Sequence, residues 1–272
     1  METILNQLID TIRAAAASKS PLCIRGGGSK DFYGGPLLGA PLEVGAYRGI
    51  VDYEPTELVI TARAGTPLAE IESALRDKNQ MLAFEPPHFG ASSTLGGCIA
   101  AGLSGPRRAS AGAVRDFVLG VRMLDGKGDN LRFGGQVMKN VAGFDVSRLM
   151  TGSLGTLGVI LEVSLKVLPL PVAEATLRFE KTAADAIANI NAWAGQPLPL
   201  GATAWHDGVL SVRLSGAAAA VEAAAKKLGG ELLDPDRAKN FWHGIREHDD
   251  AFFKTAQPLW RLSIKSTTPP LN

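Results

Sequence analysis

Glycine clusters are the feature that most limits what this chain can fold into. They lie at Gly26–Gly28, Gly96–Gly97 and Gly152–Gly158, and 14 of the 31 glycines fall between residues 91 and 160, whereas the last hundred residues hold seven. With 31 in 272 residues, glycine makes up about 11 per cent of the chain, above the usual value of about 7 per cent. Because glycine lets the backbone approach a ligand closely, the clusters predict ligand-binding loops.

The first cluster follows a predicted strand and has the composition of a phosphate-binding loop. Pro21–Arg25 is a short apolar strand that leads directly into Gly26-Gly27-Gly28-Ser29-Lys30. Consecutive backbone amides chelate a phosphate when no side chain keeps it away, and Ser29 and Lys30 add a hydroxyl and a cation. Taken alone, the segment is equally compatible with a flexible turn.

The other two glycine clusters also predict ligand-binding loops. Thr94-Leu95-Gly96-Gly97 is an amide-rich turn that we expect to precede a short helix of small residues, whose N-terminal dipole would favour a phosphate. Gly152–Gly158 precedes a strand, and its density of glycine would let the chain lie against a planar ring. Because two separate loops have the composition of phosphate-binding loops, they favour binding of a phosphorylated cofactor over turns without a ligand.

Neither of the common nucleotide motifs is matched. No third glycine opens a helix after Ser29 and Asp31, which disfavours the G-x-G-x-x-G of a Rossmann fold. The run from Gly120 to Gly126 is one residue too long for a Walker loop, and Lys127 is followed by glycine instead of Ser or Thr. The sequence therefore gives no support to nicotinamide binding or ATP hydrolysis.

Hydrophobic periodicity predicts an α+β chain, beginning with a surface helix within residues 1–20. A second helix is expected after Gly65, with Thr66 as its cap and Pro67 at its first position. The strands predicted in this part are Glu57–Arg63, Met81–Phe84, Phe117–Leu124 and Gly158–Leu168.

Beyond residue 171 the predicted order of elements is β-α-β-β-α-β. The strands are Ala173–Phe179, 200–206, 209–214 and Glu231–Leu233, and the helices are 182–194, capped by Thr182, and Ala217–Leu228. Such a split arrangement forms a sheet with helices on one face. We therefore expect a first domain at 1–171 and a smaller one at 172–272, with Trp193, Trp205, Trp242 and Trp260 mainly in its core.

Composition narrows the class of partner. The 28 basic and 27 acidic residues give a formal net charge of +1, which favours neither nucleic acid nor an anionic membrane surface. Cys23 and Cys98 are too few for a disulfide scaffold and lack the spacing of a metal site. No stretch reaches the roughly 18 to 20 apolar residues of a spanning helix. We expect a cytoplasmic protein without a metal, which reaches the inner face of the cell membrane only through partners.

The order of the motifs resembles one family. Ile24 to Ser29, Pro87, Thr94 to Gly97, Ser104-Gly105, Gly112, Asp116 to Gly120, Gly152 to Ile160 and Leu168-Pro169 occur in the order found in the FAD-linked oxidase superfamily, also called vanillyl-alcohol-oxidase or PCMH type. Two stretches, 81–108 and 116–169, are closely similar to the FAD-binding subunits of bacterial glycolate oxidase complexes.

The resemblance implies a fold and a function. It implies a PCMH-type FAD-binding domain in two parts, with dissociable FAD between them, followed by the split β-α-β-β-α-β domain. It also implies a subunit of a 2-hydroxy acid:acceptor oxidoreductase that converts glycolate to glyoxylate. Such a complex contains a second flavoprotein subunit and an iron-sulfur subunit as partners.

The resemblance further assigns cofactor contacts. The pyrophosphate is expected at the first two loops, the flavin and ribityl chain beside Gly105, Gly112 and Asp116, and the adenosine end at the backbone of Ile160. The complete set is Arg25, Gly26, Gly27, Gly28, Ser29, Lys30, Pro87, Thr94, Leu95, Gly96, Gly97, Gly105, Gly112, Asp116, Gly152, Gly155 and Ile160.

Two departures from the superfamily matter. Gly28 stands where members with covalent FAD often have His, and because glycine has no nucleophile, a histidyl linkage at this loop is excluded. Members usually continue to a C-terminal Asn-Pro-Gly type segment that returns to the flavin, whereas this sequence stops at TTPPLN. We expect that closing segment to be missing.

Groups suited to acid-base chemistry are few. Oxidation of a 2-hydroxy acid on a flavin needs a base, usually His, and cations for the carboxylate. His88, Arg107 and Arg108 are the candidates, and Lys139-Asn140 is similarly placed. A loop histidine bonded to backbone and a solvated arginine pair remain open as alternatives. His206 lies in a predicted turn, and His243 and His248 lack the spacing of a zinc pair.

The sequence leaves three functions open. We favour a flavin subunit that relays electrons, with substrate chemistry on the partner flavoprotein, because histidines are scarce. The second is a self-sufficient FAD-dependent 2-hydroxy acid dehydrogenase, or a reductase like the enolpyruvyl-sugar reductase. The third is an interaction module without a cofactor.

Overall fold

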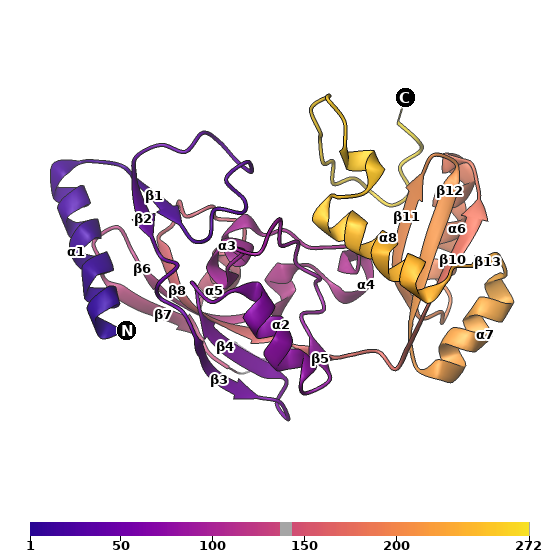
Figure 1. Ribbon diagram of the computed structural model, residues 1–272, viewed down its shortest axis with the longest axis horizontal. Helices are drawn as coiled ribbons and strands as arrows, with labels where there is room; N and C mark the ends of the chain where they lie inside the picture. The colour runs from indigo at the N-terminus through magenta and orange to yellow at the C-terminus, as the bar shows by residue number, and fades with distance from the viewer. Residues whose placement is uncertain (137–142, 272) are drawn as a thin grey trace. The chain divides into compact units, whose positions relative to one another are not determined.

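The chain folds into helices and strands that form two compact units, each described here by itself (Figure 1). The structure is a computed structural model that describes residues 1–136 and 143–271. The first unit contains residues 1–104 and 112–170, and the second contains 105–111 and the chain from 171 onward. The mixture of helices and strands in the chain confirms the predicted α+β class.

The first unit begins with a helix on a small parallel sheet. Helix α1 (Glu2–Ser18) packs its apolar face, including Leu8 and Ile12, against β1 (Leu22–Arg25) and β2 (Ala40–Glu43). The helix ends at Lys19, which has a φ of 54° and closes the last turn with its amide. The first glycine loop directly follows strand β1, as predicted.

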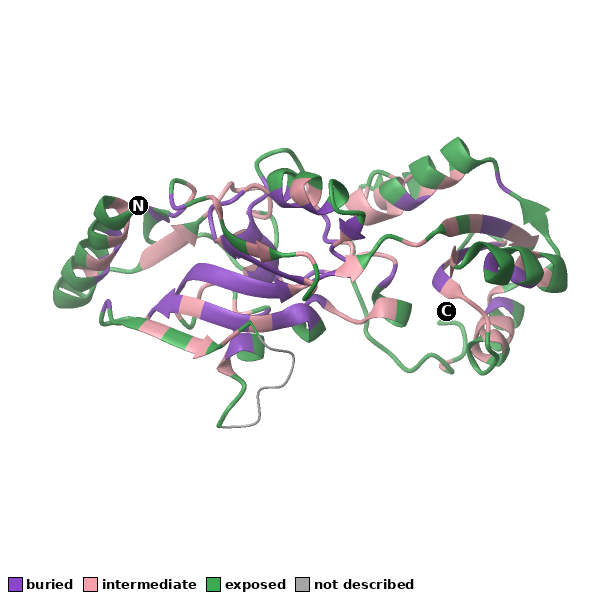
Figure 2. Cartoon of the chain, turned by 90° about the horizontal axis from the view of Figure 1, so that it is seen from below, coloured by how far each residue is buried: buried purple, intermediate pink, exposed green. Residues whose placement is uncertain are grey.

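An antiparallel sheet of five strands forms the centre of the first unit. Its spatial order is β3 (Ile50–Glu54), β4 (Val59–Arg63), β8 (Val159–Lys166), β6 (Val118–Leu124) and β7 (Asn130–Gly134). Strand β8 is buried along almost its whole length, whereas the edge strands β3 and β7 are largely exposed (Figure 2). The short strands β5 (Gln80–Met81) and β9 (Leu168–Pro169) pair separately.

Short helices complete the first unit. Helix α2 (Leu68–Arg76) buries Leu68, Ile71 and Leu75, the face predicted from the spacing of its apolar residues. Helix α3 (Leu95–Ala101) packs on β4 and β8. The remaining helical turns are η1 (Val114–Phe117) and α5 (Val146–Leu149).

Three local predictions for this unit were wrong. Pro67 caps α2, and the Thr66 hydroxyl instead accepts a hydrogen bond from the Gly49 amide at 2.8 Å. The strand predicted at Met81–Phe84 ends at Met81, because a turn follows and Phe84 enters the core. Gly96 lies inside the first turn of α3, not in a turn ahead of a helix.

The second unit contains the predicted β-α-β-β-α-β order. Its elements are β10 (Ala173–Glu180), α6 (Ala183–Ala194), β11 (Leu200–His206), β12 (Val209–Gly216), α7 (Ala218–Leu228) and β13 (Glu231–Leu232). The antiparallel sheet has the order β11-β12-β10-β13. Thr182 caps α6 through the Asp185 amide, as predicted. Leu177, Leu210 and Val212 form the core with α6 and α7.

The unit has elements that the sequence pattern did not reveal. Helix α8 (Pro235–Glu247) covers the other face of the sheet, where the Trp242 indole donates to Thr176 Oγ1 at 2.9 Å. Helix α4 (Arg108–Ala111) belongs to the inserted segment 105–111, and η2 (Ala251–Phe253) follows α8. Trp242 is buried as expected, but the core assignment was wrong for Trp205, which is 41% exposed, and for Trp260, which is 82% exposed.

Candidate cofactor site

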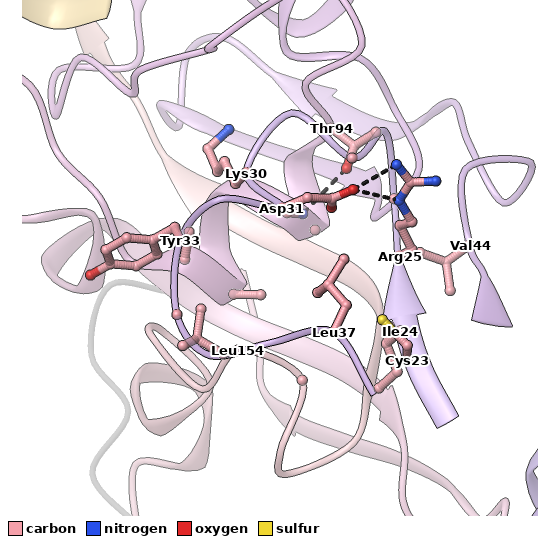
Figure 3. Close-up of a pocket in the computed structure, with 18 of the residues that line it drawn as sticks. Cys23, Ile24, Arg25, Lys30, Asp31, Tyr33, Leu37, Val44, Thr94 and Leu154 are labelled. Atoms are coloured by element: carbon pink, nitrogen blue, oxygen red, sulfur yellow. Dashed lines mark hydrogen bonds and ion pairs between the residues drawn. The ribbon is translucent and has the colours of Figure 1, made fainter. Parts of the chain in front are cut away.

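The glycine loops form a cavity in the first unit. It has a volume of about 450 Å³ and is lined from β1, the first loop, residues 31–38, the start of α3 and the segment before β8. Arg25 and Thr94 lie at its polar side in Figure 3, where Arg25 points toward Asp31. The sequence clusters separated by up to 130 residues therefore meet in one place.

The first loop offers backbone donors to this cavity. Within the part of the chain that the structure describes, the amides of Gly26, Gly27, Gly28 and Ser29 donate to no protein acceptor. Gly28 has a φ of 71°, and its carbonyl accepts the Asp31 amide, which closes the turn. Consecutive unpaired amides around a left-handed residue form an anion-binding concavity. The donor set fits a phosphate or pyrophosphate.

The charged residues of the first loop are engaged by neighbours. Arg25 donates through Nε and Nη2 to Asp31 Oδ2, at 2.9 and 2.6 Å, and this ion pair raises the pKa of Arg25. A Cβ at Gly28 would lie 2.4 Å from Arg25 Nη2, so the guanidinium covers the loop. The pair is close to neutral as a unit and leaves recognition of an anion mainly to the amides.

Lys30 ties the first loop to the segment before α3. Its ammonium group donates to Ser93 Oγ at 2.8 Å, to the His88 carbonyl at 3.2 Å and to Ser29 Oγ at 3.3 Å. It also lies over the Phe89 ring. Lys30 thus lines the cavity while its donors hold two loops together.

The second loop differs from its prediction in what it can donate. The amides of Leu95 and Gly96 donate to the carbonyls of Thr66 and Ala64, at 2.9 and 2.7 Å, and the Gly97 amide to Thr94 Oγ1 at 3.3 Å. These amides are used within the protein, so the second loop serves as a wall and the first supplies the free donors.

The glycines of the two loops are required for different reasons. A Cβ would lie 2.4 Å from Thr94 Oγ1 at Gly26 and 2.7 Å from the Ala64 Cβ at Gly96, so protein atoms exclude it. At Gly97, which lines the cavity, the only contact within 4 Å would be Thr94 Oγ1 at 3.3 Å. A Cβ could be accommodated there by a small shift of the Thr94 hydroxyl, and a larger side chain would extend into space that a ligand in the cavity would need.

Apolar residues of the cavity escaped the sequence analysis. Cys23, Tyr33, Leu37 and Leu154 line it together with Leu22, Ile24, Leu38 and Val44 (Figure 3). The run from Phe32 to Leu38 could have indicated these residues. Its apolar side chains directly follow the first glycine loop, and their spacing has the period of neither a helix nor a strand. Leu37 is 55% exposed and Leu38 70%, as expected for residues that a bound ligand would cover.

The sequence of this chain is similar to those of known proteins. A family model described as an FAD binding domain matches residues 4–134. The glycolate oxidase subunit GlcE of Escherichia coli K12 is 50% identical over 265 residues, which are 97% of this chain and 75% of that protein. The chain belongs to the GlcE family.

The chain is also similar to more distant proteins. The glycolate oxidase subunit GlcD of Bacillus subtilis is 35% identical over 47% of this chain and 27% of that protein. A solved structure of alkyldihydroxyacetonephosphate synthase covers 91% of this chain and 54% of its own, with a TM-score of 0.68 and 16% identity, which supports the PCMH-type fold. The GlcE-family chain is thus an FAD-dependent oxidoreductase subunit, and FAD is its cofactor.

The expected cofactor contacts divide into two groups. Those on the cavity are Arg25, Gly26, Gly27, Gly28, Ser29, Lys30, Thr94, Gly96, Gly97, Gly155 and Ile160. Pro87, Leu95, Gly112, Asp116 and Gly152 do not line it, and Gly105 belongs to the second unit. Leu95 is buried in the core, and Asp116 accepts the Ala113 amide at 2.9 Å. These contacts remain predictions.

His88 is not on the cavity of the GlcE-family chain. Its Nε2 lies 3.2 Å from Glu72 Oε1, and both side chains are largely buried. The ring of this loop histidine is thus paired with a carboxylate, whereas the alternative expected a backbone partner. His206 packs against Phe252, and His248 stacks on Phe253 with 4.3 Å between the ring centroids.

The prediction of an exposed arginine pair was wrong for Arg107. It is only 7% exposed, donates to Ser215 Oγ at 2.8 Å and forms an ion pair with Glu174, all within the second unit. Arg108 is exposed. Lys139-Asn140 lies outside the described residues. Arg107 thus stabilises the inserted segment on the sheet.

Among the residues that the structure describes, no group of three or more His, Cys, Asp or Glu side chains is arranged to hold a metal ion. No helix in residues 1–136 and 143–271 is long and apolar enough to cross a membrane.

Proposed function

We propose that this chain is the FAD-binding subunit of a glycolate-oxidising complex and holds its cofactor non-covalently. In the proposal, the amides of Gly26, Gly27, Gly28 and Ser29 bind the pyrophosphate, and Gly97 leaves space for it. The observation that carries this assignment is the row of four amides, without an acceptor among the described residues, on a cavity of about 450 Å³ in a relative of GlcE that is 50% identical to it.

The chain's residues would position the cofactor without reacting with it. Bound FAD supplies the redox chemistry, because a flavin accepts and returns electrons. Asp31 holds the Arg25 guanidinium over Gly28, and Lys30 fixes the spacing of the two loops. Gly28 has no nucleophilic side chain for a linkage. The apolar group of Ile24, Leu37 and Leu154 would exclude water from the aromatic end of the ligand.

We infer that substrate oxidation takes place on a partner flavoprotein and that this chain passes electrons to an iron-sulfur subunit. None of the described residues on the cavity is a histidine, and the histidine with a carboxylate partner, His88, lies off it. A base beside the flavin is what oxidation of a 2-hydroxy acid requires. We also propose that the complex that contains this chain lies at the inner face of the cell membrane.

A second function has one observation in its favour. The chain is 32% identical over 170 residues, 59% of its length, to a D-lactate dehydrogenase of Archaeoglobus fulgidus, of which it covers 36%. A self-sufficient hydroxy acid dehydrogenase is therefore the alternative to the relay.

Flavin bleaching separates the two. The purified chain is loaded with FAD, the bound flavin is counted by absorbance, and glycolate or D-lactate is added without oxygen. The relay predicts one FAD per chain and a visible band that persists until the partner flavoprotein is added. Rapid bleaching of the isolated chain would instead support the dehydrogenase, and failure to bind FAD would contradict both.

A further inference from the structure

A second cavity lies over the five-stranded sheet of the first unit. It has a volume of about 290 Å³ and shares no lining residue with the cofactor cavity. Its walls come from strands β3, β4, β8, β6 and β7, and neither the proposed FAD contacts nor the proposed function uses it.

Two adjacent cross-strand rows build this cavity. The first row contains Glu162 on β8, Arg122 on β6 and Arg132 on β7, which stand directly opposite one another. The second row, two residues further along β8, contains Ser164 with Thr61 on one side and Gly120 on the other. Gly120 has no side chain, and the backbone of Gly135 lies where its Cβ would be, so main chain bounds the cavity beside the arginines.

The first row has more positive than negative charge. Arg122 Nη1 donates to Glu162 Oε1 at 2.9 Å, and Arg132 Nη2 lies 4.0 Å from Glu162 Oε2. One carboxylate therefore serves two arginines that face each other across β6 and β7. Like charges at directly opposed positions destabilise a sheet, and a second anion between the guanidiniums would relieve this repulsion.

The arginines also have donors to spare. Among the described residues, Arg122 Nη2 and Arg132 Nε and Nη1 have no acceptor. Guanidinium groups bind carboxylates through paired N–H groups. The arginine row is thus equipped to hold one carboxylate in addition to Glu162.

The hydroxyl row supplies a further donor. Thr61 Oγ1 and Ser164 Oγ are 2.8 Å apart and share one hydrogen, and Gln136 Nε2 donates to Thr61 Oγ1 at 3.1 Å. Whichever hydroxyl donates within the pair, the other keeps a hydrogen without an acceptor in the described part of the chain. Residues two apart on a strand are separated by roughly 6 to 7 Å, which is the distance between the two rows.

We propose that this cavity binds a small organic acid with a polar group at each end, such as a four-carbon dicarboxylate. One carboxylate lies between Arg122 and Arg132, and the other end accepts from the Thr61 and Ser164 pair. The proposal does not depend on the function proposed for the first cavity, because the two cavities share no residue.

Calorimetric titration of the FAD-loaded chain tests the proposal, with succinate, acetate and phosphate as separate probes. Succinate should bind more tightly than acetate and phosphate. Arg132→Gln removes the exposed guanidinium and should weaken succinate by about tenfold or more, the loss of a hydrogen bond to a charged group. Arg115→Gln, at another exposed arginine of the same unit, is the matched control and should bind succinate as the unchanged chain does.

Each other outcome is decisive as well. No heat from succinate, or equal succinate binding in Arg132→Gln, would overturn the site. Equal affinity for acetate, phosphate and succinate would overturn the two-point recognition. Flavin absorbance is recorded in the same samples, so a failure of FAD binding is seen separately from a failure of this site.

Discussion

A Cβ atom on Gly27 would lie 1.6 Å from the carbonyl oxygen of Ser92. The first glycine loop and the segment before α3 are therefore in direct backbone contact at this point. The contact fixes the distance between the walls of the cofactor cavity, and any side chain at residue 27 would force them apart.

Gly27→Ala should accordingly destabilise the first unit and weaken FAD binding. The overlap involves backbone atoms, and overpacking of this kind costs about 1–3 kcal/mol. Thermal unfolding and fluorescence titration with FAD measure the two effects. Gly126→Ala is the control, because no atom lies within 4 Å of its added Cβ. An unchanged midpoint in Gly27→Ala would show that Ser92 is not held against residue 27.

Gly97→Asp should separate folding from binding. Among the described residues, the new Cβ would approach Thr94 Oγ1 at 3.3 Å, which a small shift of that hydroxyl relieves, so the chain should fold. The bulk and negative charge of the carboxylate would lie where the pyrophosphate is proposed. We expect loss of FAD from the purified variant, with Gly126→Asp retaining it. Stoichiometric FAD in folded Gly97→Asp would disprove the assignment of the pyrophosphate.

Cys23 should report cofactor occupancy. It is partly exposed and lines the cavity, whereas Cys98 is buried, which raises the pKa of its thiol to about 12. At pH 8, maleimide should therefore add once to the FAD-free chain and not at all to the FAD-loaded chain, as read by intact mass. Cys23→Ser should remove the adduct. Equal labelling with and without FAD would place the cofactor elsewhere.

Arg107→Ala should destabilise the second unit more than Arg108→Ala. Arg107 is buried and pairs with Glu174 and Ser215, whereas its neighbour is exposed. We expect a loss of about 1–3 kcal/mol for Arg107→Ala, reduced from the value of a fully buried pair because Glu174 is 40% exposed, and less than 0.5 kcal/mol for Arg108→Ala. Urea unfolding of both variants gives the comparison, and equal losses would contradict the assignment.

Much of the fold could be predicted from local pattern. Alternating aliphatics predicted β6 and β8, and Thr182 predicted the start of α6, because side-chain period and capping act within a few residues. Helix α8 was missed, although its cap at Asp234 and Pro235 is a readable signal. Thr66 was misassigned because its hydroxyl bonds to Gly49, which is 17 residues away.

The sequence by itself predicted a cofactor site at the glycine loops and determined that Gly28 offers no histidyl linkage. Only the tertiary structure decided which of the two loops has backbone amides available to a ligand. Among the described residues, the amides of Gly26 and Gly27 have no acceptor, whereas those of Leu95 and Gly96 donate to the carbonyls of Thr66 and Ala64. Sequence pattern reports which backbone can approach a ligand, whereas hydrogen-bond partners depend on segments brought together by folding.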